Sequence, residues 1–394
     1  MLERKIRSAV LVAGLALVPG RLIAASGGVE YHLFGGWAYG KTDGNAFLEA
    51  DEDGNYENAQ LALAASAEPM ERLRLAGQFE VRASGEEEET EVELDYAFAE
   101  WSFSDTARFR IGRIKHAFGI YAEVFDVGTV RPFYDLPAAI YGTGGIAAEN
   151  VDGAALAGSF VLSAGWGLDY TAYFGGLRTE VSEPWDVLRL QAAEPGELVG
   201  MDDEEGFVEP SHVDDVLGFQ LLFDTPGRAL SFGVSAYSGS VEREELFATE
   251  TGDDEQAETH RHVAWDAHVE WLSEPWLVRA EVASLDAEDE IRVEAAYLEL
   301  AYHLTEHWQL ATRFDWAESH VEEVDLGTLP SLAEHRDLAL GVNYWFSPNF
   351  VVKLAWHRVQ GNRFALPENA VEAILGDALD DETQLVQLGG QFSF

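Results

Sequence analysis

Apolar and polar residues alternate with a period of two along almost the whole chain after residue 27, and no stretch sustains the 3.6-residue period of an amphipathic helix. In one segment Trp308, Leu310 and Phe314 share a face, while Gln309 and Arg313 lie on the other. Sixteen such segments are present, centred near residues 34, 61, 77, 97, 110, 158, 172, 219, 234, 267, 281, 298, 312, 341, 354 and 389. The pattern therefore predicts an all-β chain of sixteen strands.

The length of these segments separates two kinds of all-β protein. Strands of soluble sandwiches also alternate, but they average about 5–6 residues, whereas these run to about 10–13. A tilted strand that crosses a bilayer needs about 9–11 residues, and a closed barrel leaves no unpaired edge in lipid. We therefore expect a 16-stranded antiparallel transmembrane β-barrel rather than a sandwich.

The connections between the predicted strands differ in length. Seven are tight turns, as at residues 104–105, 225–227 and 347–348, and the eight between them are longer and acidic, as at 202–205 and 286–290. All tight turns should lie at one end of the barrel. Aromatic residues gather beside them, which suits a lipid–water interface. These residues are Trp101, Phe103, Trp166, Trp271, Trp276, Trp308, Trp345, Phe346, Phe350, Phe392 and Phe394.

The first residues look like an export signal. Arg4, Lys5 and Arg7 precede an apolar run of residues 8–20, and the small residues Ala24 and Ala25 follow. The run is shorter than the ~18 residues of a membrane-spanning helix. We expect residues 1–25 to be a cleaved signal peptide and residues 26–394 to form the barrel.

At this point the chain resembles a known family. Residues 108–121 read Arg-Phe-Arg-Ile-Gly-Arg-Ile-Lys-His-Ala-Phe-Gly-Ile-Tyr, and residues 387–394 read Gln-Leu-Gly-Gly-Gln-Phe-Ser-Phe. With the signal peptide and strand layout, they are similar to Gram-negative outer-membrane porins, in the broad superfamily that includes the phosphate-selective porins O and P. Only four Lys are present, Lys5, Lys41, Lys115 and Lys353, which argues against phosphate selectivity.

The resemblance implies several properties. It implies a multi-pass protein of the outer membrane with short periplasmic turns, long extracellular loops and an inward-folded third loop. It also implies contact with outer-membrane lipid and lipopolysaccharide, a homotrimer, and a C-terminal signal at Phe392 and Phe394 that the barrel-assembly machinery recognises. No cofactor, metal or catalytic residue is implied.

Strand parity predicts which charged side chains face the lumen. Residues 117–150 are too long for a simple hairpin loop and mildly apolar, so we expect them to pack inside the barrel as a constriction. The predicted basic arc is Arg72, Arg74, Arg82, Arg108, Arg110, Arg113 and Lys115. The predicted constriction-loop acids, expected to face this arc, are Glu123, Asp126 and Asp135. The predicted lumen acids are Asp169, Asp266, Glu270, Glu281, Glu299, Asp315 and Asp337. Alternatively, the arginines only balance carboxylates of the wall.

Composition narrows the function. The chain has 25 Lys and Arg against 71 Asp and Glu, a net charge of −46, which excludes nucleic acid as a partner. The acidic loops are compatible with two explanations, enrichment of cations at the pore mouth and hydration in a saline habitat. The chain has no Cys, which excludes thiolate chemistry.

The sequence thus predicts a porin that passes small hydrophilic solutes and ions by passive diffusion. One alternative is a structural or surface-recognition barrel plugged by its loops. Another is an outer-membrane hydrolase, for which Ser319 and His320 are weak candidates. His260, His262, Asp266 and His268 alternate on one predicted strand, but we interpret them as ordinary polar residues rather than as a metal site.

Overall fold

The computed structural model describes residues 28–56, 58–83, 90–104, 106–142, 144–179, 211–243, 258–287, 291–321, 330–366 and 379–394. The predicted signal peptide, residues 1–25, lies outside the described residues, as does the acidic stretch 202–205. No helix within the described ranges is long and apolar enough to span a membrane.

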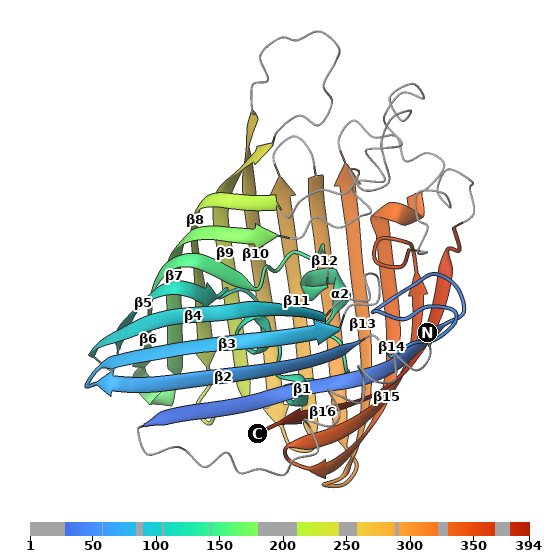
Figure 1. Cartoon of the computed structure of the whole chain (residues 1–394), viewed down its shortest axis with the longest axis horizontal. Helices are drawn as coiled ribbons and strands as arrows, with labels where there is room; N and C mark the ends of the chain where they lie inside the picture. Colours follow the sequence, from blue (N-terminus) through green and yellow to red (C-terminus); the bar gives the residue numbers. More distant parts are fainter. Residues whose placement is uncertain are drawn as a thin grey trace.

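Sixteen strands form one closed antiparallel barrel in which each strand pairs with its neighbours in sequence (Figure 1). The first eight are β1(Val29–Thr42), β2(Ala59–Met70), β3(Leu73–Ala83), β4(Thr90–Ser104), β5(Ala107–Lys115), β6(Asn150–Val161), β7(Gly167–Thr179) and β8(Ser211–Asp224). The others are β9(Leu230–Arg243), β10(Glu258–Ser273), β11(Trp276–Ala287), β12(Ile291–His303), β13(Trp308–Val321), β14(Glu334–Ser347), β15(Phe350–Gln360) and β16(Glu382–Ser393). Each predicted segment centre falls inside one of these strands, so the predicted fold class is confirmed.

The first and last strands close the barrel. Trp37 of β1 lies opposite Gly390 of β16, and the two strands run antiparallel. The backbone N–H of Leu33 donates to the carbonyl oxygen of Phe394 at 2.8 Å, and the N–H of Phe394 donates to the carbonyl oxygen of Leu33 at 2.7 Å. The sheet therefore has no unpaired edge, as a structure in hydrocarbon requires. The role of Phe392 and Phe394 in assembly stays a prediction.

Alternate residues of each strand face opposite sides of the wall. On β3, Leu75 and Phe79 are 44% and 59% exposed and point outward, whereas Gln78 and Glu80 point inward and are buried. Large apolar side chains are exposed in the same way on most other strands. Because burying such a surface in lipid is favourable and exposing it to water is not, the outer face is suited to a bilayer. The barrel thus has the build of a multi-pass outer-membrane protein.

Aromatic rings line the tight-turn end of the outer face. The ring centroids of Trp276 and Tyr302 are 4.5 Å apart, and those of Trp308 and Tyr344 are 4.9 Å apart. Trp345 differs from the prediction, because its indole Nε1 is buried and it has the opposite strand parity to its neighbour Tyr344. Phe392 is also buried, and the other predicted aromatic residues are exposed or partly exposed.

One connection is shorter than expected. The acidic stretch 286–290 was predicted as a long loop, but β11 continues to Ala287 and β12 begins at Ile291, which leaves three residues between them. Asp286 belongs to the strand and lies opposite Arg292. Asp286 thus lies directly across from a residue of opposite charge, a neighbour that favours an extended conformation for this acidic segment.

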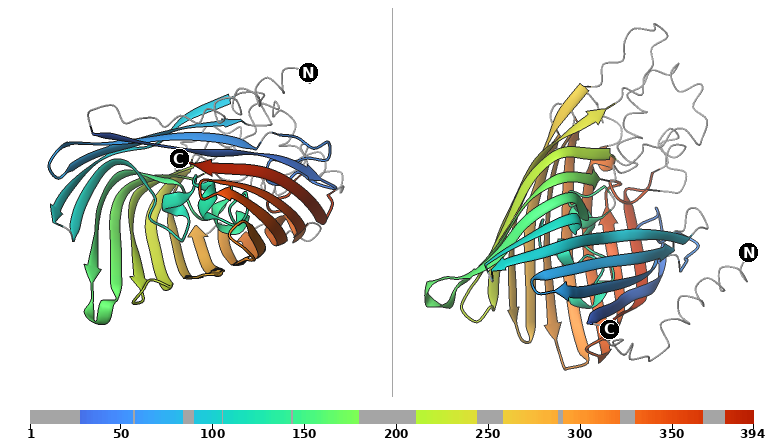
Figure 2. Two further views of the ribbon diagram at one scale, coloured as in Figure 1. Left: turned by 90° about the horizontal axis from the view of Figure 1, so that it is seen from below. Right: turned by 60° about the vertical axis from the view of Figure 1, so that its left-hand side comes forward.

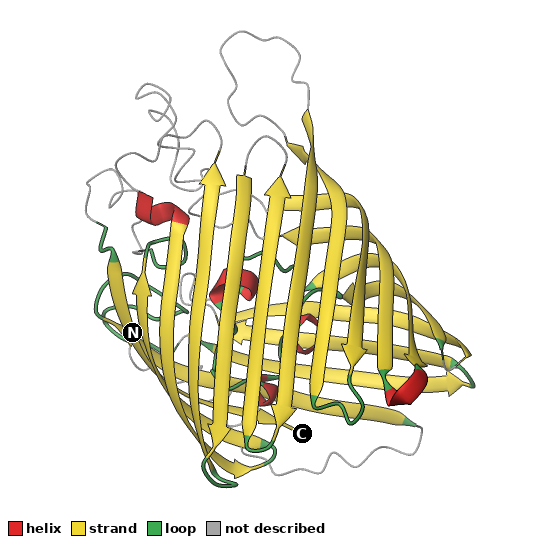
Figure 3. Cartoon of the chain, turned by 180° about the vertical axis from the view of Figure 1, so that it is seen from behind, coloured by secondary structure: helices red, strands yellow, loops and turns green. Residues whose placement is uncertain are grey.

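Residues 116–149, which we call the inner loop, connect β5 to β6 and lie within the ring of strands (Figure 2, left). The inner loop contains two 3-10 turns, η1(Ala122–Val124) and η2(Gly128–Val130), and one short helix, α2(Ala138–Tyr141). These helical pieces are seen between the strands when the barrel is viewed from behind (Figure 3). The inner loop therefore occupies part of the barrel interior.

Candidate pore and its inner loop

The ammonium of Lys353 fixes the inner loop to the wall formed by β15 and β16. Its Nζ donates to the backbone oxygens of Gly128, Arg131 and Phe133 at 2.8, 2.7 and 2.9 Å, and to Gln391 Oε1 at 2.5 Å. Lys353 is 2% exposed. A buried ammonium is stable only when its donors are paired, so these carbonyl groups and Lys353 position one another.

Carboxylates of β11, β12 and β13 hold the inner loop against the neighbouring part of the wall. The Tyr121 hydroxyl donates to Glu299 at 2.6 Å, and the backbone N–H of Ala139 donates to Asp315 at 3.2 Å. The Tyr141 hydroxyl donates to both oxygens of Glu281, at 2.8 and 2.9 Å. Burial, and then Glu281, raise the pKa of Tyr141 well above its usual value, so this phenol keeps its proton and donates.

Most of the predicted lumen acids therefore do not line open water. They face inward as parity indicates, but the inner loop and neighbouring wall residues cover them. The buried ones are Asp266, Glu281, Glu299, Asp315 and Asp337. Of the remaining two, Glu270 pairs with Arg279 Nε at 2.5 Å, and Asp169 is partly exposed near the tight-turn end. The prediction of an acidic water-filled lumen is wrong for the covered five, because a folded loop occupies that space.

The other side of the interior carries four arginines of β3 and β5. Arg74, Arg82, Arg108 and Arg110 face inward, since Leu75, Phe79, Phe109 and Ile111 of the same strands take the outward parity. We call these four residues the arginine wall. The Arg82 side chain is 42% exposed and the Arg110 side chain 18% exposed. Arg82 and, to a smaller extent, Arg110 are therefore accessible to water, although Gln78 and Glu80 beside Arg82 on β3 are buried.

Ion pairs link the arginine wall to its surroundings. Arg82 Nη2 lies 3.0 Å from Glu149 of the inner loop, and its Nε contacts Glu80. Arg110 Nε lies 2.7 Å from Glu100, and its Nη1 lies 3.4 Å from Glu123. Neither Arg74 nor Arg108 forms an ion pair with another described residue. The wall thus keeps part of its positive charge directed at the interior.

Two members of the predicted basic arc do not line the lumen. Arg72 lies in the turn between β2 and β3, where it adopts φ 72°. Arg113 shares the outward parity of Phe109 and Ile111, and its guanidinium pairs with Asp152 at 2.8 Å on the outer face of the wall. The prediction for these two residues is wrong, because strand alternation continues through Arg113 and the strand has not begun at Arg72.

Lys115 ends β5 and turns inward to the inner loop. Its Nζ donates to Asp95 at 2.7 Å and to Asp126 at 2.9 Å. Burial by itself would raise the pKa of Asp126, but the Lys115 ammonium outweighs it and lowers that pKa to about 2. Asp126 therefore stays charged at any physiological pH and neutralises Lys115.

The three predicted loop acids are divided between two sides. Glu123 faces Arg110, and its side chain is 55% exposed. Asp126 faces Lys115 and also accepts from Gln78 at 2.8 Å. Asp135 accepts instead from Gln387 at 2.6 Å and Asn58 at 2.9 Å. The expectation that Asp135 opposes the arginines is wrong, because the inner loop has turned toward β16 before it reaches this residue.

The hydrolase candidates Ser319 and His320 do not form a site with one another, and His262 does not join them. The Ser319 hydroxyl accepts from Arg363 Nη1 inside the barrel, whereas His320 is exposed and takes the opposite strand parity. His262 contacts the Tyr237 hydroxyl at 3.2 Å, and the side chain of His260 lies outside the described residues. Ser319 and His320 therefore cannot share a proton in this geometry.

Solved outer-membrane proteins have the same architecture. The outer membrane channel DcaP of Acinetobacter baumannii matches with a TM-score of 0.58 and 12% identity over 94% of this chain and 99% of that one. The trimer form of OmpT from Vibrio cholerae (0.53, 11%, covering 93% and 100%) and the anion-selective porin from Comamonas acidovorans (0.53, 9%, covering 93% and 99%) also match. The chain has a porin-type fold. No protein-family model matches the sequence, and a search of curated proteins finds no similar sequence.

In this porin-type barrel, sequence reasoning missed the groups that anchor the inner loop. Lys353, Tyr121 and Tyr141 are buried and make the contacts that decide where the loop lies. A weak signal was present for each, since Lys353 is one of the few cations at lumen-facing positions, with Arg279 and Arg313, and the tyrosines interrupt a loop of otherwise mixed polarity. The contacts that join the loop to the wall, however, are between residues 140 or more positions apart in sequence, and only the closed barrel brings them together.

Proposed function

We propose that this porin-type barrel is a passive diffusion channel for small hydrophilic solutes and ions. The observation that supports this proposal most is the division of the interior. The inner loop fills much of the interior, while Arg82 and Arg110, whose side chains are 42% and 18% exposed, keep contact with water and face Glu149 and Glu123. Such charges are stable in a water-filled passage and costly in a closed one.

The charges across this passage have opposite signs. The arginine wall lies on β3 and β5, and Glu123 and Glu149 belong to the inner loop. A transverse field between them orients dipolar solutes and disfavours apolar ones. Since two of the four arginines have no ion-pair partner among the described residues, we propose that the wall increases the anion permeability of the narrowest part.

The remaining proposals extend the porin-type fold to its setting. We infer export directed by residues 1–25, assembly by the barrel-assembly machinery, and contact with lipid and lipopolysaccharide. The trimer form of OmpT supports a homotrimer here. No catalytic step is assigned to the chain.

A second function is favoured by a specific observation. The inner loop buries the inner faces of Glu281, Glu299, Asp315 and Lys353 to 2% exposure or less. If the loops also closed the side of the arginine wall, the barrel would be a plugged structural or surface-recognition protein. This second function predicts stable insertion into a bilayer without current.

Planar-bilayer recording tests the proposal. We expect stepwise current from the purified protein, and a reversal potential in a salt gradient that shifts toward cation preference in Arg74→Ala and Arg110→Ala, because each removes a positive charge from the passage. Arg113→Ala is the matched control, since it removes the same charge from the same strand on the outer face. Insertion without current would favour the plugged barrel. Equal shifts of the reversal potential in all three variants would show that the arginine wall does not set the ion preference.

A further inference from the structure

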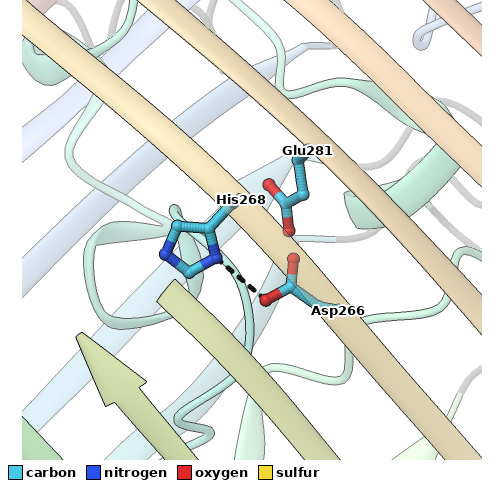
Figure 4. A group of neighbouring side chains, drawn as sticks. All are labelled: Asp266, His268 and Glu281. Atoms are coloured by element: carbon cyan, nitrogen blue, oxygen red, sulfur yellow. Dashed lines mark hydrogen bonds and ion pairs between the residues drawn. The ribbon is translucent and has the colours of Figure 1, made fainter. Parts of the chain in front are cut away.

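Three potential metal ligands converge on the inner wall beneath the inner loop, away from the arginine wall. Asp266 and His268 belong to β10 and Glu281 to β11, and Figure 4 shows their side chains directed toward one another. One ligand atom from each residue lies within 4.8 Å of the other two. Among the described residues, this is the one group of three that meets that distance.

Strand register explains the convergence. His268 lies directly opposite Glu281 in the antiparallel pair β10–β11, and Asp266 is two residues from His268 on the same face. Residues that are opposite and residues two apart share a side of a sheet. The three ligands therefore come from rigid strands rather than from a loop, so their positions are fixed before any ion arrives.

The negative charge of this group is not balanced. Asp266 is 2% and Glu281 is 1% exposed, yet neither forms an ion pair with a described Lys or Arg. The Asp266 Oδ2 atom is buried and has no hydrogen-bond partner, and it points toward Glu281 (Figure 4). Two neighbouring carboxylates that are buried in this way require a cation or a shared proton between them.

The surrounding groups orient the ligands. The Ser235 hydroxyl donates to Asp266 Oδ1 at 2.9 Å, and the Tyr141 hydroxyl donates to Glu281. His268 Nδ1 lies 2.9 Å from Asp266 Oδ1, while Nε2 is directed at Gly233, where a Cβ atom would come within 2.3 Å of it. Nδ1 is thus the nitrogen available to the group, and partners of this kind typically raise metal affinity.

The inner loop leaves space for the Glu281 and Tyr141 side chains because it has a glycine, Gly119, beside them. Gly119 adopts φ 70°, and a Cβ atom there would lie 2.2 Å from Glu281 Oε1 and 2.1 Å from the Tyr141 hydroxyl. The N–H of Gly119 donates to the Ser235 hydroxyl at 3.1 Å, which itself donates to Asp266. The loop therefore contacts both carboxylate ligands through their hydrogen-bond partners.

We propose that Asp266, His268 and Glu281 bind one divalent transition-metal ion, with Zn²⁺ as the preferred ion. One imidazole nitrogen and two carboxylates match the ligand types and number of zinc sites that keep a further position for water. Ca²⁺ and Mg²⁺ require more oxygen ligands and fit this set poorly. The ion replaces the contact between His268 Nδ1 and Asp266 Oδ1 and neutralises the two carboxylates.

Binding of the ion joins the inner loop to the wall. Gly119 contacts Asp266 through the Ser235 hydroxyl, and Tyr141 contacts Glu281 directly. A bound ion should therefore restrain the loop at Gly119 and Tyr141. This proposal is independent of conduction, since it uses residues on the covered side of the barrel. An open channel and a plugged barrel would both hold the site.

Direct titration tests the site. The full chain without a polyhistidine tag, refolded in detergent and treated with chelator, is titrated with Zn²⁺ alone and, separately, with Ca²⁺. We expect one Zn²⁺ per chain, no comparable Ca²⁺ binding, and an affinity for Zn²⁺ at least about tenfold lower in Asp266→Asn and His268→Gln. His357→Gln is the matched control, because His357 also pairs with a buried carboxylate, Asp337 at 2.7 Å, on another part of the inner wall.

Two results would overturn the proposal. One is the absence of stoichiometric Zn²⁺ binding by the wild-type chain, and the other is an affinity in Asp266→Asn and His268→Gln equal to that of the control. Should the variants fail to fold, the wild-type chain still decides the matter through Co²⁺. A bound Co²⁺ in a site of four or five ligands absorbs strongly in the visible range and is displaced by Zn²⁺, whereas six-coordinate Co²⁺ in water absorbs weakly.

Discussion

At the residue scale, the Lys353 ammonium joins the inner loop to the wall through three backbone oxygens of the loop. It reaches three consecutive parts of the loop, at Gly128, Arg131 and Phe133. Removing the ammonium leaves those carbonyl oxygens buried without a donor, at a cost of about 1–3 kcal/mol for each. The loop can avoid this cost only by moving away from the wall into water.

Lys353→Met should therefore release the inner loop while the barrel remains folded. Methionine has a similar length but no donor, so the loop should open near Phe133 and Tyr134, which are buried in the native structure. We expect chymotrypsin to cleave after these residues at least about tenfold faster than in the wild type. Lys41→Met is the control, since Lys41 is exposed on β1. Equal cleavage in both variants would show that Lys353 does not hold the loop.

Strand parity in the sequence predicts the face of the strand on which a side chain lies, but not whether that side chain is buried. It places Asp266, Glu299 and Lys353 on the inner face of their strands, and the structure has all three there. What parity could not supply is which inner-facing residues the loop covers. That depends on hydrogen bonds between residues far apart in sequence, such as Tyr121 with Glu299, which no local pattern records.

At the element scale, the inner loop begins at a buried histidine. His116 directly follows β5, its Nδ1 contacts the backbone oxygen of Ala148 at 3.0 Å, and its Nε2 contacts the Tyr173 hydroxyl at 2.8 Å. The two ends of the loop are thus joined to each other and to β7. Burial lowers the pKa of His116 from 6.5 to about 4, so the folded chain holds this residue neutral.

This histidine predicts how stability depends on pH. Between about pH 6.5 and pH 4 the unfolded chain binds a proton at His116 and the folded chain does not, so the free energy of unfolding falls as the pH is lowered through this range. By about pH 4, the lowered pKa of His116 reduces the free energy of unfolding by about 3 kcal/mol. His116→Gln should reduce that dependence in denaturant titrations in detergent. An unchanged slope would mean that His116 is protonated in the folded chain.

Strands were easier to predict than connections. All sixteen could be predicted because period-two alternation is local and a bilayer sets a minimum length for each strand. The acidic segment between β11 and β12 was wrongly interpreted as a long loop, because the position of Asp286 opposite Arg292 depends on the neighbouring strand. The inward packing of residues 117–150 was expected from their apolar content, but its hydrogen bonds were not.

At the scale of the whole molecule, charge is distributed unevenly. The chain carries a net charge of −46, yet the water-exposed side of the interior is lined by the arginine wall. The field of surface acids decays over about 10 Å at 0.1 M salt. We therefore expect the arginines and the facing loop acids, rather than the net charge, to set the ion preference within the passage.

The central claim is that water passes between the inner loop and the arginine wall. Because the chain has no cysteine, a single cysteine can be placed on either face of β5 and modified by a charged, water-soluble thiol reagent during current recording. Arg110→Cys should respond with a stepwise change in current. Ile111→Cys, one residue away and 55% exposed on the outer face, should not. Inserted protein that carries no current would contradict the claim. So would a current that responds to modification at residue 110 no more than at residue 111.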